Sequence, residues 1–240
     1  MYSERFRQFI EIWQRDFAIE RSMNEKVCID RDGKPLPWYT YPAIEYLSQF
    51  DYHDKIVFEF GAGSSSMYWA ARARSVISVE DNPEWKHKLL HEFKADNWQL
   101  RYCESKDDYA AAVLADGAKY DVIIVDGKYR AACAANAVKC LASGGIIILD
   151  DSDRVNTSDD YIAAVKILRA ADLLQVDFYG FCPLNNFTKA TSIFFSRDFA
   201  FKSVNPLQPC NGIGNIWSMS RKQRKEFFKK QDYPLPEDDE

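Results

Sequence analysis

The sequence predicts an α/β fold in which strands and helices alternate around a mostly parallel sheet. Short apolar or β-branched runs recur along the chain, and helical segments separate them. One run, Val122 to Val125, is β-branched at every position, as expected of a strand covered on both faces. The length of 240 residues suits one such domain with modest additions.

The composition is that of an ordinary globular protein, with 47% apolar and 28% charged residues and a net charge of −5. This charge gives no whole-chain attraction to nucleic acid, so we expect no nucleic-acid partner. No apolar run reaches the roughly 18 residues of a transmembrane helix, and the charged N-terminus is unlike a signal peptide. We therefore expect no membrane insertion and a cytoplasmic protein, in which the six scattered cysteines are reduced.

The first fifty residues are expected to form an N-terminal helical cap and connector. Residues 3–22 fit one amphipathic helix, with Phe6, Phe9 and Trp13 on the same face. That face could contact a second copy of the chain to form a homodimer, or cover the site as a lid, or pack on the domain as a cap. A proline-containing connector follows, and Pro42 begins a short helix.

The stretch from Lys55 to Glu80 carries the functional prediction. An apolar strand leads into a turn with glycines at 61 and 63, then a helical segment, then a second strand that stops at Glu80. Glycine lets the backbone approach a ligand closely, and the serines after it can cap a helix whose first N–H groups remain free. Glu80 is placed to bind two ribose hydroxyls.

The identity of the nucleotide depends on Ser66 and Glu59. A dinucleotide motif requires a third glycine where Ser66 stands, and the carboxylate of Glu59 would repel a pyrophosphate. This E-x-G-x-G pattern resembles motif I of the class I S-adenosylmethionine (SAM) methyltransferases. The other interpretation is a tight turn with a surface glutamate. The resemblance implies SAM as cofactor and these cofactor-binding residues: Glu59, Gly61, Gly63, Ser64, Ser65, Glu80 and Asp126.

Two later blocks extend the resemblance to residues 38–200. The strand before Asp126 and the strand before Asp150 and Asp151, joined by a helix and a Gly-Gly turn, resemble the fourth and fifth strands of that family. Residues 173–181 and 190–196 resemble its closing antiparallel pair. The resemblance implies a three-layer Rossmann-like sandwich with a mostly parallel seven-stranded sheet. We expect a SAM-binding domain at 51–202 and a partly flexible C-terminal extension at 203–240.

The resemblance also implies methyl transfer, and we expect the acceptor to be a small hydroxylated or sugar-like molecule. Asp126 and Asp150 are the candidate catalytic residues. Together with Asp151 they could hold Mg²⁺ or Ca²⁺, as in metal-dependent O-methyltransferases of this fold. Alternatively, Asp126 bonds the cofactor or acts as a general base, while the other two cap a turn. Candidate acceptor contacts are Tyr39, Thr40, Tyr41 and Asn185, although core packing explains the first three equally well.

The sequence leaves two other functions open. An NAD-dependent oxidoreductase would share the first half of the chain, but the missing third glycine and the closing strand pair oppose it. A non-catalytic scaffold would keep the fold without the cofactor, and the intact residues Glu59, Gly61, Gly63 and Glu80 oppose that.

Overall fold

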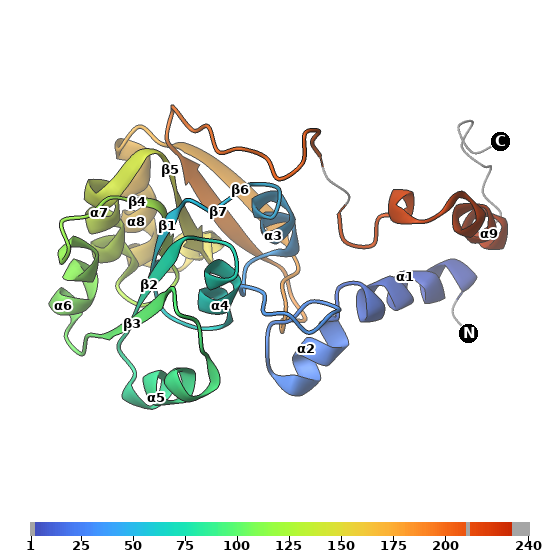
Figure 1. Cartoon of the computed structure of the whole chain (residues 1–240), viewed down its shortest axis with the longest axis horizontal. Helices are drawn as coiled ribbons and strands as arrows, with labels where there is room; N and C mark the ends of the chain where they lie inside the picture. The colour runs from blue at the N-terminus through green and yellow to red at the C-terminus, as the bar shows by residue number, and fades with distance from the viewer. Residues whose placement is uncertain (1–2, 210–211, 232–240) are drawn as a thin grey trace.

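The computed structural model describes residues 3–209 and 212–231, and a twisted seven-stranded sheet forms its centre (Figure 1). The strand order is β3-β2-β1-β4-β5-β7-β6, and β7 runs antiparallel to both of its neighbours while the remaining pairs are parallel. The predicted mostly parallel sheet with an antiparallel closing strand is confirmed. The strands are β1 (Ile56–Phe60), β2 (Ser75–Glu80), β3 (Trp98–Tyr102), β4 (Tyr120–Val125), β5 (Leu141–Asp150), β6 (Leu174–Gly180) and β7 (Lys189–Phe195).

Helices lie on both faces of the sheet, which makes the three layers (Figure 1). The α-helices are α1 (Glu4–Arg15), α2 (Ile19–Glu25), α3 (Tyr41–Leu47), α4 (Ser64–Ala70), α5 (Pro83–Glu92), α6 (Lys106–Ala111), α7 (Arg130–Cys140), α8 (Asp159–Ala170) and α9 (Arg221–Gln231). Short 3-10 turns are η1 (Ala112–Leu114), η2 (Ser152–Asn156) and η3 (Ile216–Ser218).

The side chains of β4 explain why the sheet needs both helical layers. Val122 and Ile124 belong to the core on the side of α3 and α4, whereas Ile123 and Val125 belong to the core formed with α6, α7 and α8. Successive side chains of a strand point to opposite faces. A strand that is apolar at every position therefore buries both of its faces. Because helices cover both faces of the sheet, the carboxyl ends of the strands are where a ligand can approach it.

The N-terminal helix differs from the prediction. The expected single helix over residues 3–22 is two helices, and Ala18 between them has a φ of 49°. The ring of Phe17 packs on Trp13 and Tyr41, with centroid separations of 4.6 and 4.7 Å, and the Phe17 carbonyl accepts a 3.0 Å hydrogen bond from the Tyr41 hydroxyl. The Phe17 carbonyl, which a continuous helix would use for its own backbone hydrogen bond, therefore bonds to the Tyr41 hydroxyl of α3 instead.

The C-terminal helix returns to the N-terminus. Figure 1 shows α9 beside α1, at the end of the molecule opposite β3, and the two helices are in contact. The acidic tail after Gln231, which the sequence led us to expect to be flexible, lies outside the described residues. In the part of the chain that the structure covers, every helix is too short or too polar to cross a bilayer.

Candidate functional site

A cavity of about 650 Å³ opens at the carboxyl ends of the parallel strands. Its wall contains Glu80 from the end of β2, Asp126 directly after β4, and Asp150 from the end of β5. This is the edge where open α/β sheets bind their ligands. The glycine turn contributes Gly61, Gly63, Ser64 and Ser65 to the same wall.

The two glycines of the turn differ in whether the backbone requires glycine. Gly61 has a φ of +89°, and a Cβ there would lie 2.9 Å from the carbonyl oxygen of Asp126. The turns after β1 and β4 therefore touch, and only glycine fits between them. Gly63 has extended backbone, and a Cβ there would meet nothing within 4 Å. Gly63 thus leaves open space at the cavity wall.

Glu59 lies behind the turn, fully buried, and does not line the cavity. Its carboxylate accepts hydrogen bonds from the hydroxyls of Ser65, Ser66 (2.5 Å) and Ser78 (2.8 Å). Burial raises the pKa of Glu59 to about 7, although the serine hydroxyls oppose the rise. Glu59 was expected to face the cofactor, and in the structure its carboxylate instead anchors the first turn of α4 from beneath, because the odd-numbered positions of β1 point toward α4.

Glu80 does face the cavity, and the backbone fixes its carboxylate there. One oxygen accepts from the amides of Asp81 (3.0 Å) and Asn82 (2.8 Å), and the other accepts from Ala62 in the glycine turn (3.4 Å). Burial raises its pKa, and these amide bonds oppose the rise. A carboxylate has about four acceptor positions, so capacity remains for a ligand hydroxyl.

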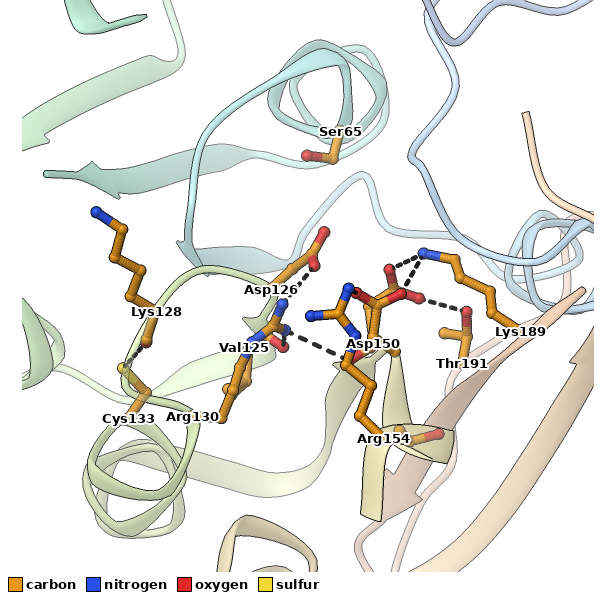
Figure 2. A network of polar contacts seen from close by, with 12 residues as sticks. Ser65, Val125, Asp126, Lys128, Arg130, Cys133, Asp150, Arg154, Lys189 and Thr191 are labelled. Carbon is orange, nitrogen blue, oxygen red and sulfur yellow. Dashed lines mark hydrogen bonds and ion pairs between the residues drawn. The ribbon is translucent and has the colours of Figure 1, made fainter. Parts of the chain in front are cut away.

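The Asp126 and Asp150 carboxylates each have a cationic neighbour (Figure 2). Arg130 donates to Asp126 over 3.1 Å, while Asp150 accepts from Lys189 and from the Thr191 hydroxyl (2.6 Å). Burial raises the pKa of Asp126, against the opposing charge of Arg130. Burial and the charge of Asp126 raise the pKa of Asp150 to about 7. Both groups therefore bind a proton more readily than an exposed aspartate.

Asp151 completes the cluster but does not make it a metal site. Its carboxylate lies 2.9 Å from the Lys189 ammonium and 3.2 Å from the Arg154 guanidinium. Although burial alone would raise the pKa of Asp151, these cations hold it below its ordinary value. Over residues 3–209 and 212–231, no three histidine, cysteine or acidic side chains are grouped to hold a metal ion. The structure gives no support to the Mg²⁺ or Ca²⁺ site expected at Asp126, Asp150 and Asp151, because lysine and arginine side chains already neutralise these carboxylates.

The candidate acceptor residues divide into two groups. Asn185 lines the cavity, as expected. Tyr39, Thr40 and Tyr41 are buried in the core beside α3 and do not line it. The Thr40 hydroxyl donates to the Phe178 carbonyl of β6 over 2.9 Å, so this segment joins α3 to the closing strands. The three side chains are therefore not placed to contact an acceptor in the cavity.

Sequence reasoning missed the side chains that take their place. The neighbouring Trp38 lines the cavity and is 46% exposed, and Phe187 lines it and is 60% exposed. Lys189 lines it from the first position of β7. The sequence signal for Lys189 was a charged residue at the start of an otherwise apolar strand. This signal points to the site only when β7 is known to lie beside β5, the strand that ends in Asp150.

The comparisons with known proteins bear on the fold. No protein-family model matches the sequence, and no curated protein is significantly similar to it. The structure is similar to precorrin-6y C5,15-methyltransferase from Geobacter metallireducens GS-15, with 18% identity, a TM-score of 0.50, and 64% of this chain and 86% of that chain covered. It is also similar to the O-methyltransferase TomG from Streptomyces achromogenes, solved with SAM, with 12% identity, a TM-score of 0.51, and 77% and 88% covered.

These similarities show that the chain has the Rossmann-like fold of the class I SAM-dependent methyltransferases. The antiparallel β7 at the sixth position of the sheet is part of that fold. At such low identities the likeness concerns the fold alone.

Proposed function

We propose that this protein is a SAM-dependent methyltransferase that methylates a hydroxyl oxygen of a small acceptor. The observation that carries the proposal is the meeting of the Gly61–Gly63 turn, Glu80 and Asp126 in one cavity at the strand ends. A ribose fits beside Glu80, which has free acceptor capacity for its hydroxyls. The methyltransferase fold supports the same assignment.

Bound SAM would supply a methyl group on a sulfonium, ready for in-line displacement. The residues of this chain then have to hold the acceptor in line and exclude water. Asp126 faces the cavity and has a raised pKa, which suits it to accept the hydroxyl proton. That proton leaves as the oxygen–methyl bond forms and the carbon–sulfur pair goes to sulfur. Asp150, held by Lys189 and Thr191, is proposed to fix the acceptor side of the cavity.

Isothermal titration calorimetry with SAM, its demethylated product S-adenosylhomocysteine, and NAD tests this proposal. We expect SAM and its product to bind saturably and NAD not to bind. Glu80→Ala removes the partner of the ribose hydroxyls. It should weaken SAM binding about tenfold or more, because a hydrogen bond to a charged group contributes about 1.5–3 kcal/mol. Glu84→Gln, an exposed change on α5, serves as the matched control.

Binding of NAD alone would overturn the proposal in favour of an oxidoreductase. A folded protein that binds none of the three would instead point to a non-catalytic scaffold. Equal affinity of the Glu80→Ala variant and the wild type for SAM would remove Glu80 from the cofactor site.

We also propose that two copies of the chain associate through α1. Phe9 is 53% exposed on this helix, at the end of the molecule away from the sheet (Figure 1). The helix carries both acidic and basic residues, including the Glu4–Arg7 ion pair. Such a mixed surface can pair with a second copy of itself around a two-fold axis.

A further inference from the structure

Lys189 is a buried lysine whose ammonium lies at the cavity wall. It opens β7, and its side chain is only 8% exposed. The ammonium contacts Asp150 and lies 2.9 Å from Asp151 (Figure 2). Although burial alone would lower its pKa, Asp150, Asp126 and Asp151 raise the pKa above the ordinary lysine value. The group therefore carries a positive charge at physiological pH.

One N–H bond of this ammonium is available to a ligand. An ammonium has three donors, and within the described part of the chain its hydrogen bonds go to Asp150 and Asp151. Nζ also lies over the indole of Trp38, 5.8 Å from the centroid of that ring. Both Lys189 and Trp38 line the cavity. The two carboxylates thus hold a cation in a fixed position beside an exposed aromatic ring.

We propose, on the basis of the methyltransferase function above, that the Lys189 ammonium binds the acceptor oxygen and stabilises it as an oxyanion. The acceptor class that fits is a phenol. Trp38 and Phe187 present exposed rings against which an aromatic acceptor can stack. A phenol also ionises far more readily than an alkyl alcohol, so one fixed ammonium can supply the stabilisation without a divalent cation.

The charges of the cluster balance during this step. The carboxylates of Asp126, Asp150 and Asp151 are matched by three cations, Lys189, Arg130 and Arg154. When the phenol proton moves to Asp126, the cluster gains one positive charge and the oxygen gains one negative charge. The oxyanion then forms its bond to the methyl carbon, the carbon–sulfur bond breaks, and its electron pair goes to sulfur. No other reactant is required.

The test uses 4-nitrophenol, whose ionised form absorbs visible light, bound to the full chain saturated with S-adenosylhomocysteine. The absorbance of the bound probe is followed against pH for the wild type, Lys189→Met, and the surface control Lys166→Met on α8. We expect the bound probe to ionise at least about one pH unit lower than the free probe in the wild type and control, as for an acid beside a fixed opposite charge. In Lys189→Met that lowering is lost.

Several outcomes would overturn the assignment. The first is an unchanged ionisation of the probe in Lys189→Met. The second is a wild-type complex with S-adenosylhomocysteine that does not bind the probe. The third is a Lys189→Met variant that loses affinity for S-adenosylhomocysteine but keeps affinity for 5′-methylthioadenosine, since Lys189 would then bind the cofactor carboxylate. Failure of the wild type to bind S-adenosylhomocysteine is a different result, and it contradicts the methyltransferase proposal itself.

Removal of Lys189 alone leaves Asp150 buried without its cation, which can unfold a protein. The double variant Lys189→Met with Asp150→Asn removes both charges of the pair. We expect it to fold, to bind S-adenosylhomocysteine, and to bind 4-nitrophenol without the lowered ionisation. A lowered ionisation in this folded double variant contradicts the role of Lys189.

Discussion

Glu59 illustrates what a single residue of a motif can and cannot reveal. The sequence shows a carboxylate two residues before a glycine turn, and the resemblance to motif I of the class I SAM methyltransferases implies a ligand contact. In the structure, the carboxylate is enclosed by the hydroxyls of Ser65, Ser66 and Ser78. The three serines were visible in the sequence, but Ser78 is 19 residues away, and only the pairing of β1 with β2 brings it opposite Glu59. The motif is visible in the sequence, whereas the direction of the Glu59 side chain could not be predicted from it.

The pKa of Glu59 predicts a pH-dependent contribution to stability. Burial raises it to about 7 from an unfolded value near 4.5. Between these values the native state binds the extra proton, so the contribution of Glu59 is fully present below pH 4.5 and is lost as the pH rises through 7. Glu59→Gln, which has no charge to lose, should gain stability relative to the wild type by about 3 kcal/mol between pH 4.5 and pH 8.

Urea denaturation at a series of pH values measures this difference, and Glu84→Gln on exposed α5 gives the baseline. A constant difference between Glu59→Gln and the wild type across that range would show that Glu59 remains ionised in the folded protein.

At the scale of the element, the glycine turn offers a matched pair of substitutions. Gly61→Ala forces a positive φ on alanine and places Cβ 2.9 Å from the Asp126 carbonyl. We expect it to lower the free energy of unfolding by about 1–3 kcal/mol and to disturb the cavity. Gly63→Ala meets no atom within 4 Å and needs no unusual backbone. It should keep wild-type stability while its methyl group occupies space at the cavity wall, which lowers affinity for SAM.

Thermal unfolding and SAM titration of both variants separate the two effects. Equal stability of Gly61→Ala and Gly63→Ala would mean that the turns after β1 and β4 do not touch as described. Unchanged SAM affinity in Gly63→Ala would place the ligand elsewhere along the turn.

The elements themselves were predictable where hydrophobic periodicity dominates, as in β4, and less so where tertiary contacts decide. The aromatic face of residues 3–22 indicated a helix, but the packing of Phe17 on Tyr41, which divides it, is a contact between distant segments. The turn expected at Ser143–Gly145 lies inside β5, because the register between β4 and β5 shifts there. Tyr39 to Tyr41 looked like a binding segment because aromatic residues serve both cores and sites. Burial distinguishes the two uses, and it is not visible in a sequence.

At the scale of the whole molecule, the order of strands and helices predicted a mostly parallel sheet and the edge where the site lies, and the resemblance to the class I SAM methyltransferases implied its antiparallel closing strand. The composition of the acceptor side was not predictable. Trp38, Lys189 and Asp150 come from the connector, β7 and β5, and they meet only because β7 inserts beside β5. From the sequence a metal was one of the open interpretations of these carboxylates, and in the structure Lys189 contacts Asp150 and Asp151. The expected division at residues 50 and 202 stays a prediction.

The exposed Phe9 of α1 leads to the last prediction, which concerns the association of two copies of the chain. If two copies pair through α1, Phe9→Lys places a charge in the centre of the interface from both copies and should weaken association by about 2 kcal/mol or more. Light scattering coupled to size-exclusion chromatography, at several protein concentrations, measures the shift from dimer to monomer. Tyr179→Lys is the matched control, because Tyr179 is 68% exposed on the edge strand β6. Edge strands also pair between molecules, so dissociation in Tyr179→Lys but not in Phe9→Lys would move the interface to β6, and a monomeric wild type would contradict both.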